Sequence, residues 1–217
     1  MNLEQARTNM VEQQIRTWEV LDQDVLDLLY LVPREQFVPQ EHRALAFSDL
    51  EIPLGHGERM WQPKLEARVL QELGIRRTEH VLEVGTGSGY FTALLAHRCA
   101  QVCSVEISPA LAAFGQRNLE RHGADNVQLE IGDAARGWAA HAPYDVIVLT
   151  GSTPVLPQAL LEQLAPAGRL FAVVGEAPAM AARLVTRAGP GEQRHTDLFE
   201  TVIRPLVNAE RPSRFKF

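Results

Sequence analysis

The stretch of sequence that decides the fold reads His80-Val81-Leu82-Glu83-Val84-Gly85-Thr86-Gly87-Ser88-Gly89-Tyr90. An apolar run leads into a turn with three glycines at alternate positions, and helix-forming residues follow from Phe91 to Ala96. Glycines lack the Cβ atoms that would keep a ligand away from the backbone, and a helix that begins there presents free N–H groups. The stretch therefore predicts a strand, a ligand-binding turn and a helix in succession.

Short apolar runs alternate with helical stretches on the C-terminal side of this turn. Together with residues 80–84, the strand candidates are residues 101–105, 127–131, 144–149 and 169–174. Near-continuous apolar strands separated by helices are typical of a parallel sheet that is covered on both faces. The sequence thus predicts a doubly wound α/β fold.

The N-terminal part has a different pattern. Apolar residues recur every three or four positions over residues 3–18, and a second helix is expected from a cap at Asp22 to Pro33. Residues 47–63 lose this periodicity and contain prolines and glycines, which predicts a long loop. A further helix is expected over residues 64–73. We predict that residues 1–63 form a helical cap with an acceptor loop, and that residues 64–217 form the ligand-binding domain of one compact unit.

The C-terminal part predicts a closing β-hairpin. Runs at residues 184–186 and 198–206 flank the turn Gly189-Pro190-Gly191. The locally basic residues 211–217 are interpreted as a solvated tail. Thr150-Gly151-Ser152 after the fourth strand is a candidate for a pocket floor or a plain turn.

Composition limits the class of protein. The chain has 217 residues, of which 46% are hydrophobic and 22% charged, as expected for a folded globular protein. Its formal net charge of −6 argues against a nucleic-acid partner. The N-terminus lacks signal-peptide features and no apolar run approaches the ~20 residues that span a bilayer, so we expect a cytoplasmic protein without a membrane partner. The sequence leaves the oligomeric state open.

Cysteines and histidines give no metal motif. Cys99 and Cys103 are interpreted as buried free thiols, because two cysteines are too few for a disulfide scaffold and their spacing is not that of a zinc knuckle. The seven histidines are scattered along the chain without a Cys/His cluster. We therefore predict no metal.

Acidic residues at successive strand ends indicate a nucleoside site. Glu106 ends the strand after the glycine turn, 21 positions beyond Gly85, where its carboxylate could accept ribose hydroxyls. In the dinucleotide pattern the third glycine or alanine would fall at Tyr90, and an acidic Glu83 suits a ligand with an ammonium and a sulfonium better than a diphosphate. Asp133 could accept an adenine amino group. We predict S-adenosylmethionine as the cofactor, bound by Glu83, Gly85, Thr86, Gly87, Ser88, Gly89, Glu106, Ile107, Asp133 and Ala134.

The chain resembles the protein-L-isoaspartate O-methyltransferase family from about residue 5 to residue 207. The similarity rests on 32–39 (Val-Pro-Arg-Glu-Gln-Phe-Val-Pro), 53–57 (Pro-Leu-Gly-His-Gly) and the glycine stretch, together with Gly132-Asp133 before Gly137-Trp138, Ala142-Pro143-Tyr144-Asp145 and residues 160–168. This resemblance implies a seven-stranded, Rossmann-like methyltransferase sheet with an N-terminal helical cap. It also implies methyl esterification of isoaspartyl carboxylates in damaged proteins, which is a repair reaction.

One departure from the family pattern falls in the acceptor loop. Family members usually continue after Gly-His-Gly with Gln-Thr-Ile-Ser, whereas this chain has Glu58-Arg59-Met60-Trp61. Trp61 stands at the family's catalytic serine and Arg59 at its threonine. An acceptor carboxylate, with a pKa of ~3.9, is already ionised at neutral pH and needs no general base. Arg59 offers a planar set of donors for a carboxylate, so one hypothesis gives it the contact that the hydroxyl makes in the family.

Two alternatives stay open from sequence. Trp61 could stack on a small aromatic acceptor, and because a phenol with a pKa of ~10 needs a base, His56 would be the nearest candidate. Trp61 could also be a plain loop anchor. A cofactor-binding protein without transfer activity is the second alternative. The candidate catalytic residues are His56, Arg59 and Trp61.

Overall fold

The computed structural model describes residues 2–189 and 191–212. Pro190 of the predicted C-terminal turn and residues 213–217 of the predicted basic tail lie outside the described residues. No helix in the described part of the chain combines the length and apolar character needed to cross a membrane.

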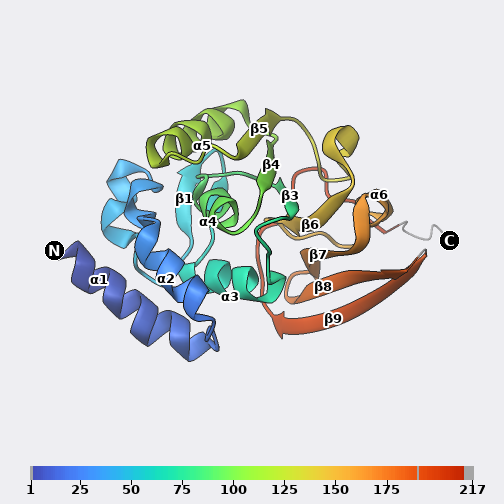
Figure 1. Ribbon diagram of the computed structural model, residues 1–217. Helices are drawn as coiled ribbons and strands as arrows, with labels where there is room; N and C mark the ends of the chain where they lie inside the picture. Colours follow the sequence, from blue (N-terminus) through green and yellow to red (C-terminus); the bar gives the residue numbers. More distant parts are fainter. Residues whose placement is uncertain (1, 190, 213–217) are drawn as a thin grey trace.

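A seven-stranded sheet forms the centre of the molecule (Figure 1). The strand order is β5-β4-β3-β6-β7-β8-β9, with parallel pairing from β5 to β7 and antiparallel pairing of β8 and β9 at one edge. This arrangement confirms the predicted doubly wound sheet and its C-terminal hairpin. The strands are β3 (His80–Val84), β4 (Gln101–Glu106), β5 (Val127–Ile131), β6 (Tyr144–Leu149), β7 (Leu164–Glu176), β8 (Ala179–Gly189) and β9 (Glu192–Glu200).

Side chains of the central strands alternate between two hydrophobic clusters. Val81 and Val146 pack with the helices of one face, whereas Leu82 and Ile147 pack against the other. Burial on both faces explains why these strands read as continuous apolar runs. The first face is covered by α3 (Pro63–Leu73), α4 (Tyr90–Arg98) and α5 (Pro109–His122), and the second by α6 (Gln158–Glu162) and the segment before the 3₁₀ turn η5 (Ala139–His141).

The N-terminal helices extend the first hydrophobic cluster (Figure 1). Residues 3–18 are helical throughout, as predicted, but the winding changes from α1 (Leu3–Asn9) to a π-helix (Met10–Ile15) and a 3₁₀ turn (Arg16–Trp18). Asp22 caps α2 (Gln23–Leu31) by accepting the Asp24 N–H at 2.9 Å, which confirms the predicted start. Two 3₁₀ turns follow, η3 (Arg34–Gln36) and η4 (Gln40–Leu45).

Residues 47–63 are not a long irregular loop, and that prediction was wrong. They contain an antiparallel hairpin of β1 (Ile52–Gly55) and β2 (Glu58–Met60). Gly55, His56 and Gly57 all have positive φ, at +85°, +53° and +84°, which is the backbone of a tight hairpin turn. Strands this short carry too little alternation to be recognised from sequence.

The last predicted strand begins and ends six residues earlier than expected, at residues 192–200 instead of 198–206. β9 ends at Glu200, and the residues after it cross to the end of β6, where Ser152 N–H donates to Arg204 O at 2.8 Å and Leu206 N–H donates to Ser152 O at 2.9 Å. Pro205 has no N–H to continue a ladder, which is consistent with this departure from the sheet. The crossing brings residues 204–207 to the carboxyl ends of the central strands.

Candidate functional site

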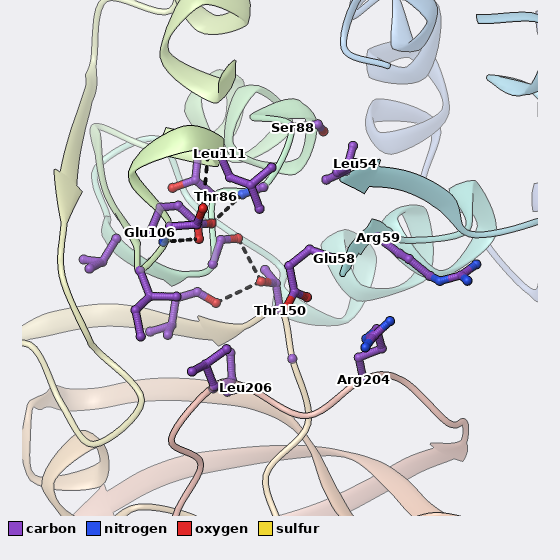
Figure 2. Close-up of a pocket in the computed structure, with 18 of the residues that line it drawn as sticks. Leu54, Glu58, Arg59, Thr86, Ser88, Glu106, Leu111, Thr150, Arg204 and Leu206 are labelled. Carbon is purple, nitrogen blue, oxygen red and sulfur yellow. Dashed lines mark hydrogen bonds between the residues drawn. The ribbon is translucent and has the colours of Figure 1, made fainter. Parts of the chain in front are cut away.

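A cavity lies at the carboxyl ends of β3, β4 and β6, where the strand order reverses (Figure 2). Open α/β sheets bind their ligands at such switch points. One part of its wall comes from the glycine turn and the strand ends, and the other from the β1–β2 hairpin. Residues 204–207 of the C-terminal segment form the remaining part of the cavity wall. Its lining includes Glu51, Leu54, His56, Glu58, Arg59, Met60, Trp61, Glu66, Gly85, Thr86, Gly87, Ser88, Phe91, Glu106, Ile107, Ser108, Leu111, Asp133, Ala134, Thr150, Gly151, Arg204 and Leu206.

The glycine turn is held against the end of β6. Gly85 has φ +102°, and a Cβ at this position would lie 2.2 Å from Thr150 Oγ1. The Thr150 hydroxyl lies 2.9 Å from Val84 O and 2.8 Å from Gly85 O, close enough to donate to either carbonyl. Glycine is therefore required at position 85 for both conformation and space. Thr150, one of the candidates for the pocket floor, has this structural role as well.

Glu106 fits the role of ribose acceptor. Its side chain is 4% exposed, and its two oxygens accept the backbone N–H groups of Gly87 and Ser108, each at 2.9 Å. A carboxylate has about four lone-pair sites, so acceptor capacity is left for two neighbouring hydroxyls. Ile107 beside it is 38% exposed and gives the wall an apolar surface for a flat base.

Asp133 and Ala134 also line the cavity, but Asp133 is already engaged. Its Oδ1 accepts the Ala135 N–H at 3.0 Å, and its Oδ2 accepts from Asn208 Nδ2 at 2.9 Å. Asp133 therefore connects the turn after β5 to the C-terminal segment. Sequence reasoning missed Asn208, since nothing in its neighbourhood resembles a binding motif.

Two predicted cofactor residues lie outside the cavity lining. Glu83 is fully buried beneath the turn, where its Oε2 accepts from Thr92 at 2.5 Å and from Ser104 at 2.6 Å. Burial raises the pKa of this carboxyl to about 8. A Cβ on Gly89 would lie 3.0 Å from Gly115 O, so this glycine permits close packing of α4 against α5. The prediction for Glu83 rested on its distance from the glycine turn along the chain, whereas the pleat of β3 directs its side chain toward Thr92 of α4.

The β1–β2 hairpin and Trp61 after it form one wall of the cavity, called the acceptor wall after the predicted acceptor loop, and this wall contains the three candidate catalytic residues. His56 is exposed at the hairpin turn, and Arg59 is exposed on β2. Trp61 is only 7% exposed and packs on Phe91 with ring centroids 5.5 Å apart. Figure 2 shows the Glu58 side chain extending into the cavity and the Arg59 side chain extending outward, as expected for neighbours on a strand.

The buried side chain of Arg34 holds this wall in place. It is fully buried, and its guanidinium donates to Ala46 O at 2.8 Å, to Trp61 O at 2.6 Å and to the Glu66 carboxylate. Burial raises the pKa of Glu66 to about 8, and the charge of Arg34 opposes this rise. Arg34 was part of the resemblance, but its partners are too far along the chain to be identified from sequence.

Comparisons with known proteins agree with the geometry. Residues 5–211 match the family described as protein-L-isoaspartate(D-aspartate) O-methyltransferase. A protein-L-isoaspartate O-methyltransferase of Methanoculleus marisnigri is 43% identical, over 78% of this chain and 77% of that protein. A solved protein-L-isoaspartate O-methyltransferase superposes with a TM-score of 0.80 at 25% identity, covering 93% of this chain and 66% of the longer solved chain. A Plasmodium falciparum structure in complex with S-adenosyl-L-homocysteine shares the fold, with a TM-score of 0.76 at 21% identity over 92% and 97% of the two chains.

The fold and the cavity define an S-adenosylmethionine-dependent methyltransferase. The glycine turn, the free acceptor capacity of Glu106 and the apolar surface at Ile107 fit this cofactor. Within this class, the chain belongs to the protein-L-isoaspartate(D-aspartate) O-methyltransferase family.

Proposed function

We propose that this protein methylates the side-chain carboxylate of L-isoaspartyl residues in damaged proteins. The observation that carries the proposal is the continuity of the cavity, which joins the glycine turn and Glu106 to an acceptor wall that opens to solvent at the hairpin. Family membership supports the reaction. Acceptor recognition has to be argued from the residues of this chain, because Arg59 and Trp61 replace the threonine and serine that the family usually has in this wall.

The proposed methyl transfer depends on positioning the acceptor carboxylate and needs no proton transfer from it. S-adenosylmethionine supplies a methyl group on a sulfonium, and transfer to a carboxylate oxygen yields a methyl ester and S-adenosylhomocysteine. An acceptor carboxyl with a pKa of ~3.9 is ionised at neutral pH, so His56 is not needed as a base. Alignment of reacting groups alone can lower a barrier by ~7–11 kcal/mol. The protein's task is to hold the acceptor oxygen in line with the methyl group.

We assign recognition of the acceptor carboxylate to two arginines that come from different segments lining the cavity. Arg59 lies on β2 and Arg204 on the C-terminal segment (Figure 2). Both side chains belong to exposed residues, so they can meet a carboxylate that arrives on a protein surface.

Trp61 is assigned the role of an anchor for this wall. Its ring is buried against Phe91 and its carbonyl accepts from Arg34. A ring in this position forms part of the wall and does not offer an open face for stacking on a small aromatic acceptor. We therefore do not propose a phenolic substrate.

Matched peptides test this function. Purified protein is incubated with methyl-labelled S-adenosylmethionine and with peptides that differ only in an isoaspartyl or aspartyl linkage, and base-labile methyl ester is counted. We expect ester on the isoaspartyl peptide alone. Equal ester on both peptides, or none on either while S-adenosylhomocysteine binds, would contradict the proposal.

A further inference from the structure

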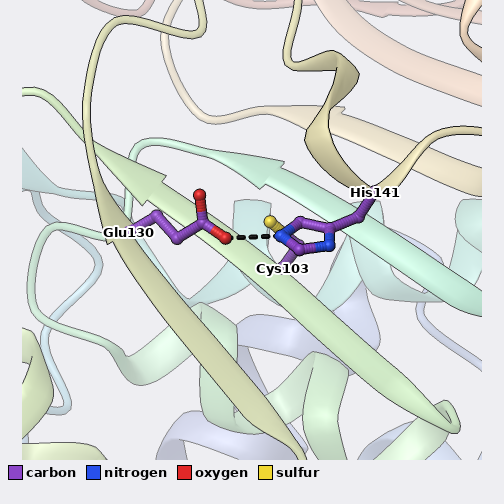
Figure 3. A group of neighbouring side chains, drawn as sticks. All are labelled: Cys103, Glu130 and His141. Atoms are coloured by element: carbon purple, nitrogen blue, oxygen red, sulfur yellow. Dashed lines mark hydrogen bonds and ion pairs between the residues drawn. The ribbon is translucent and has the colours of Figure 1, made fainter.

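A second cluster of reactive side chains lies outside the methyl-transfer cavity (Figure 3). Cys103 comes from β4, Glu130 from β5 and His141 from the 3₁₀ turn η5. One sulfur, one oxygen and one imidazole nitrogen from these residues all lie within 4.8 Å of one another. None of the three lines the cavity, and the proposed methyl transfer gives them no role.

We propose that Cys103, Glu130 and His141 form a zinc-binding site. A thiolate, an imidazole and a carboxylate are the ligand types that zinc uses in proteins, whereas Mg²⁺ and Ca²⁺ prefer oxygen ligands alone. The sequence contains no recognisable motif because the three residues are separated by 27 and 11 positions and meet only through strand pairing and the return of the chain.

The distances are compatible with zinc after small side-chain movements. Bonds of about 2.0–2.3 Å in a tetrahedral arrangement place ligand atoms about 3.3–3.8 Å apart. Glu130 and His141 now share a contact of 2.5 Å between Oε1 and Nε2, so these two atoms would separate by about 1 Å, which is within the range of ordinary rotamer adjustment. The His141 side chain is 39% exposed, which leaves room for its rotation and for a water as fourth ligand.

The surroundings orient the carboxylate. Trp138 Nε1 donates to Glu130 Oε2 at 3.0 Å, and Gln128 Nε2 donates to Oε1 at 2.9 Å. Hydrogen bonds of this kind hold metal ligands in place. The Trp138 ring is itself fixed, because it covers Gly132 so closely that a Cβ there would lie 2.5 Å from the ring.

Charge balance favours a divalent ion. One thiolate and one carboxylate neutralise Zn²⁺, so the occupied site buries no net charge. Zinc binds cysteine as the thiolate, so binding at Cys103 would release the thiol proton to solvent.

Zinc binding would also affect the methyl-transfer cavity. Residues 131–140 lie between the last two ligands, and Asp133, Ala134 and Ala135 within them line the methyl-transfer cavity. A zinc ion would connect η5 to β4 and β5 and thereby restrain this segment. Zinc should consequently raise the melting temperature of the full-length protein, as any ligand of the native state does.

The test uses purified, chelator-treated protein titrated with Co²⁺ as a spectroscopic probe and with Zn²⁺ in competition. We expect one equivalent to bind with a thiolate-to-cobalt charge-transfer band. The band should disappear in Cys103→Ser. In His141→Ala, affinity should fall by more than about tenfold, since losing even an outer partner of a ligand costs 10–100-fold.

Matched variants make the result decisive. Cys99→Ser removes the chain's other thiol and His195→Ala removes an exposed imidazole, and both should bind metal like the unmodified protein. If Cys103→Ser fails to fold, the His141→Ala variant tests the proposal instead, because His141 is exposed and its loss should not impair folding. A missing charge-transfer band, a band that depends on Cys99, or equal affinity in His141→Ala would overturn the proposal.

Discussion

The two halves of the methyl-transfer cavity are built in different ways. The cofactor half is formed by consecutive backbone at the glycine turn and by two strand ends of one βαβ unit, with Glu106 holding the Gly87 N–H. The acceptor half is assembled from distant segments, with Arg34 holding the hairpin by the Trp61 carbonyl and residues 204–207 forming the remaining part of the cavity wall. The first half depends on backbone conformation, and the second depends on a few long-range side-chain contacts. Substitutions should therefore separate cofactor binding from acceptor methylation.

Arg34→Leu should give the largest effect. The substitution leaves Glu66 as a buried carboxyl without its partner, and breaking a buried pair costs about 3–5 kcal/mol of unfolding free energy. Chemical denaturation measures this loss. In variants that remain folded under assay conditions, isoaspartyl methylation should fall while S-adenosylhomocysteine still binds.

Two control variants show whether the stability loss in Arg34→Leu comes from the buried pair with Glu66. Arg43→Leu removes an exposed arginine and should change stability by less than about 0.5 kcal/mol. The double variant Arg34→Leu/Glu66→Leu removes both partners of the buried pair and should recover much of the loss, as apolar replacement of buried pairs often does. A double variant as unstable as the sum of its single substitutions would show that the pair is not the source of the effect.

Gly85→Ala should act on the cofactor half. The new Cβ would lie 2.2 Å from Thr150 Oγ1 at a φ of +102°, and such strain costs about 1–3 kcal/mol. Calorimetry should show S-adenosylhomocysteine affinity reduced about 10–100-fold. Gly123→Ala is the matched control, because it has φ +79° with no atom within 4 Å of its Cβ. Equal losses of affinity in both variants would rule out the contact with Thr150 as the cause.

Glu83 should give a smaller, pH-dependent effect on stability. Its pKa is about 8 in the folded protein against an ordinary 4.5, so between these values the folded state holds a proton that the unfolded state has lost. The stability that this group contributes is therefore complete below pH 4.5 and is lost as pH rises through 8. The slope is roughly 1 kcal/mol per pH unit. Denaturation across this range should show a flatter slope in Glu83→Gln, and an unchanged slope would assign the effect to another group, such as Glu66.

Much of the sheet could be predicted from the sequence. Residues 80–84, 127–131 and 144–149 form strands with the predicted bounds. The first and the last of these are buried on both faces and therefore leave near-continuous apolar runs, whereas residues 127–131 form the half-buried edge strand and alternate apolar and polar residues. The β1–β2 hairpin could not be predicted in the same way, since its pairing is fixed by three positive φ angles at Gly55–Gly57. Residues 201–206 were also predicted to be part of a strand, but the structure shows that their hydrogen bonds to Ser152 are contacts across the fold.

The same contrast holds for the site. Gly85, Gly87, Glu106, Ile107 and Asp133 all line the cavity, because their spacing follows from the strand–turn–helix geometry, and their contact with the cofactor stays a prediction. Sequence spacing could not reveal that Glu83 points away from the cavity toward Thr92, since strand pleating decides this. Arg204 and Asn208 were missed because only the folded chain brings them to the site.

Arg59→Ala, assayed for both cofactor affinity and methyl transfer, tests the separation of the two halves most directly. Calorimetry with S-adenosylhomocysteine and ester counting with the isoaspartyl peptide are carried out on the same preparation. We expect cofactor affinity within about twofold of the unmodified protein and transfer reduced about tenfold, since a charge-assisted hydrogen bond is lost. Unchanged transfer, or a parallel loss of cofactor affinity, would contradict this separation.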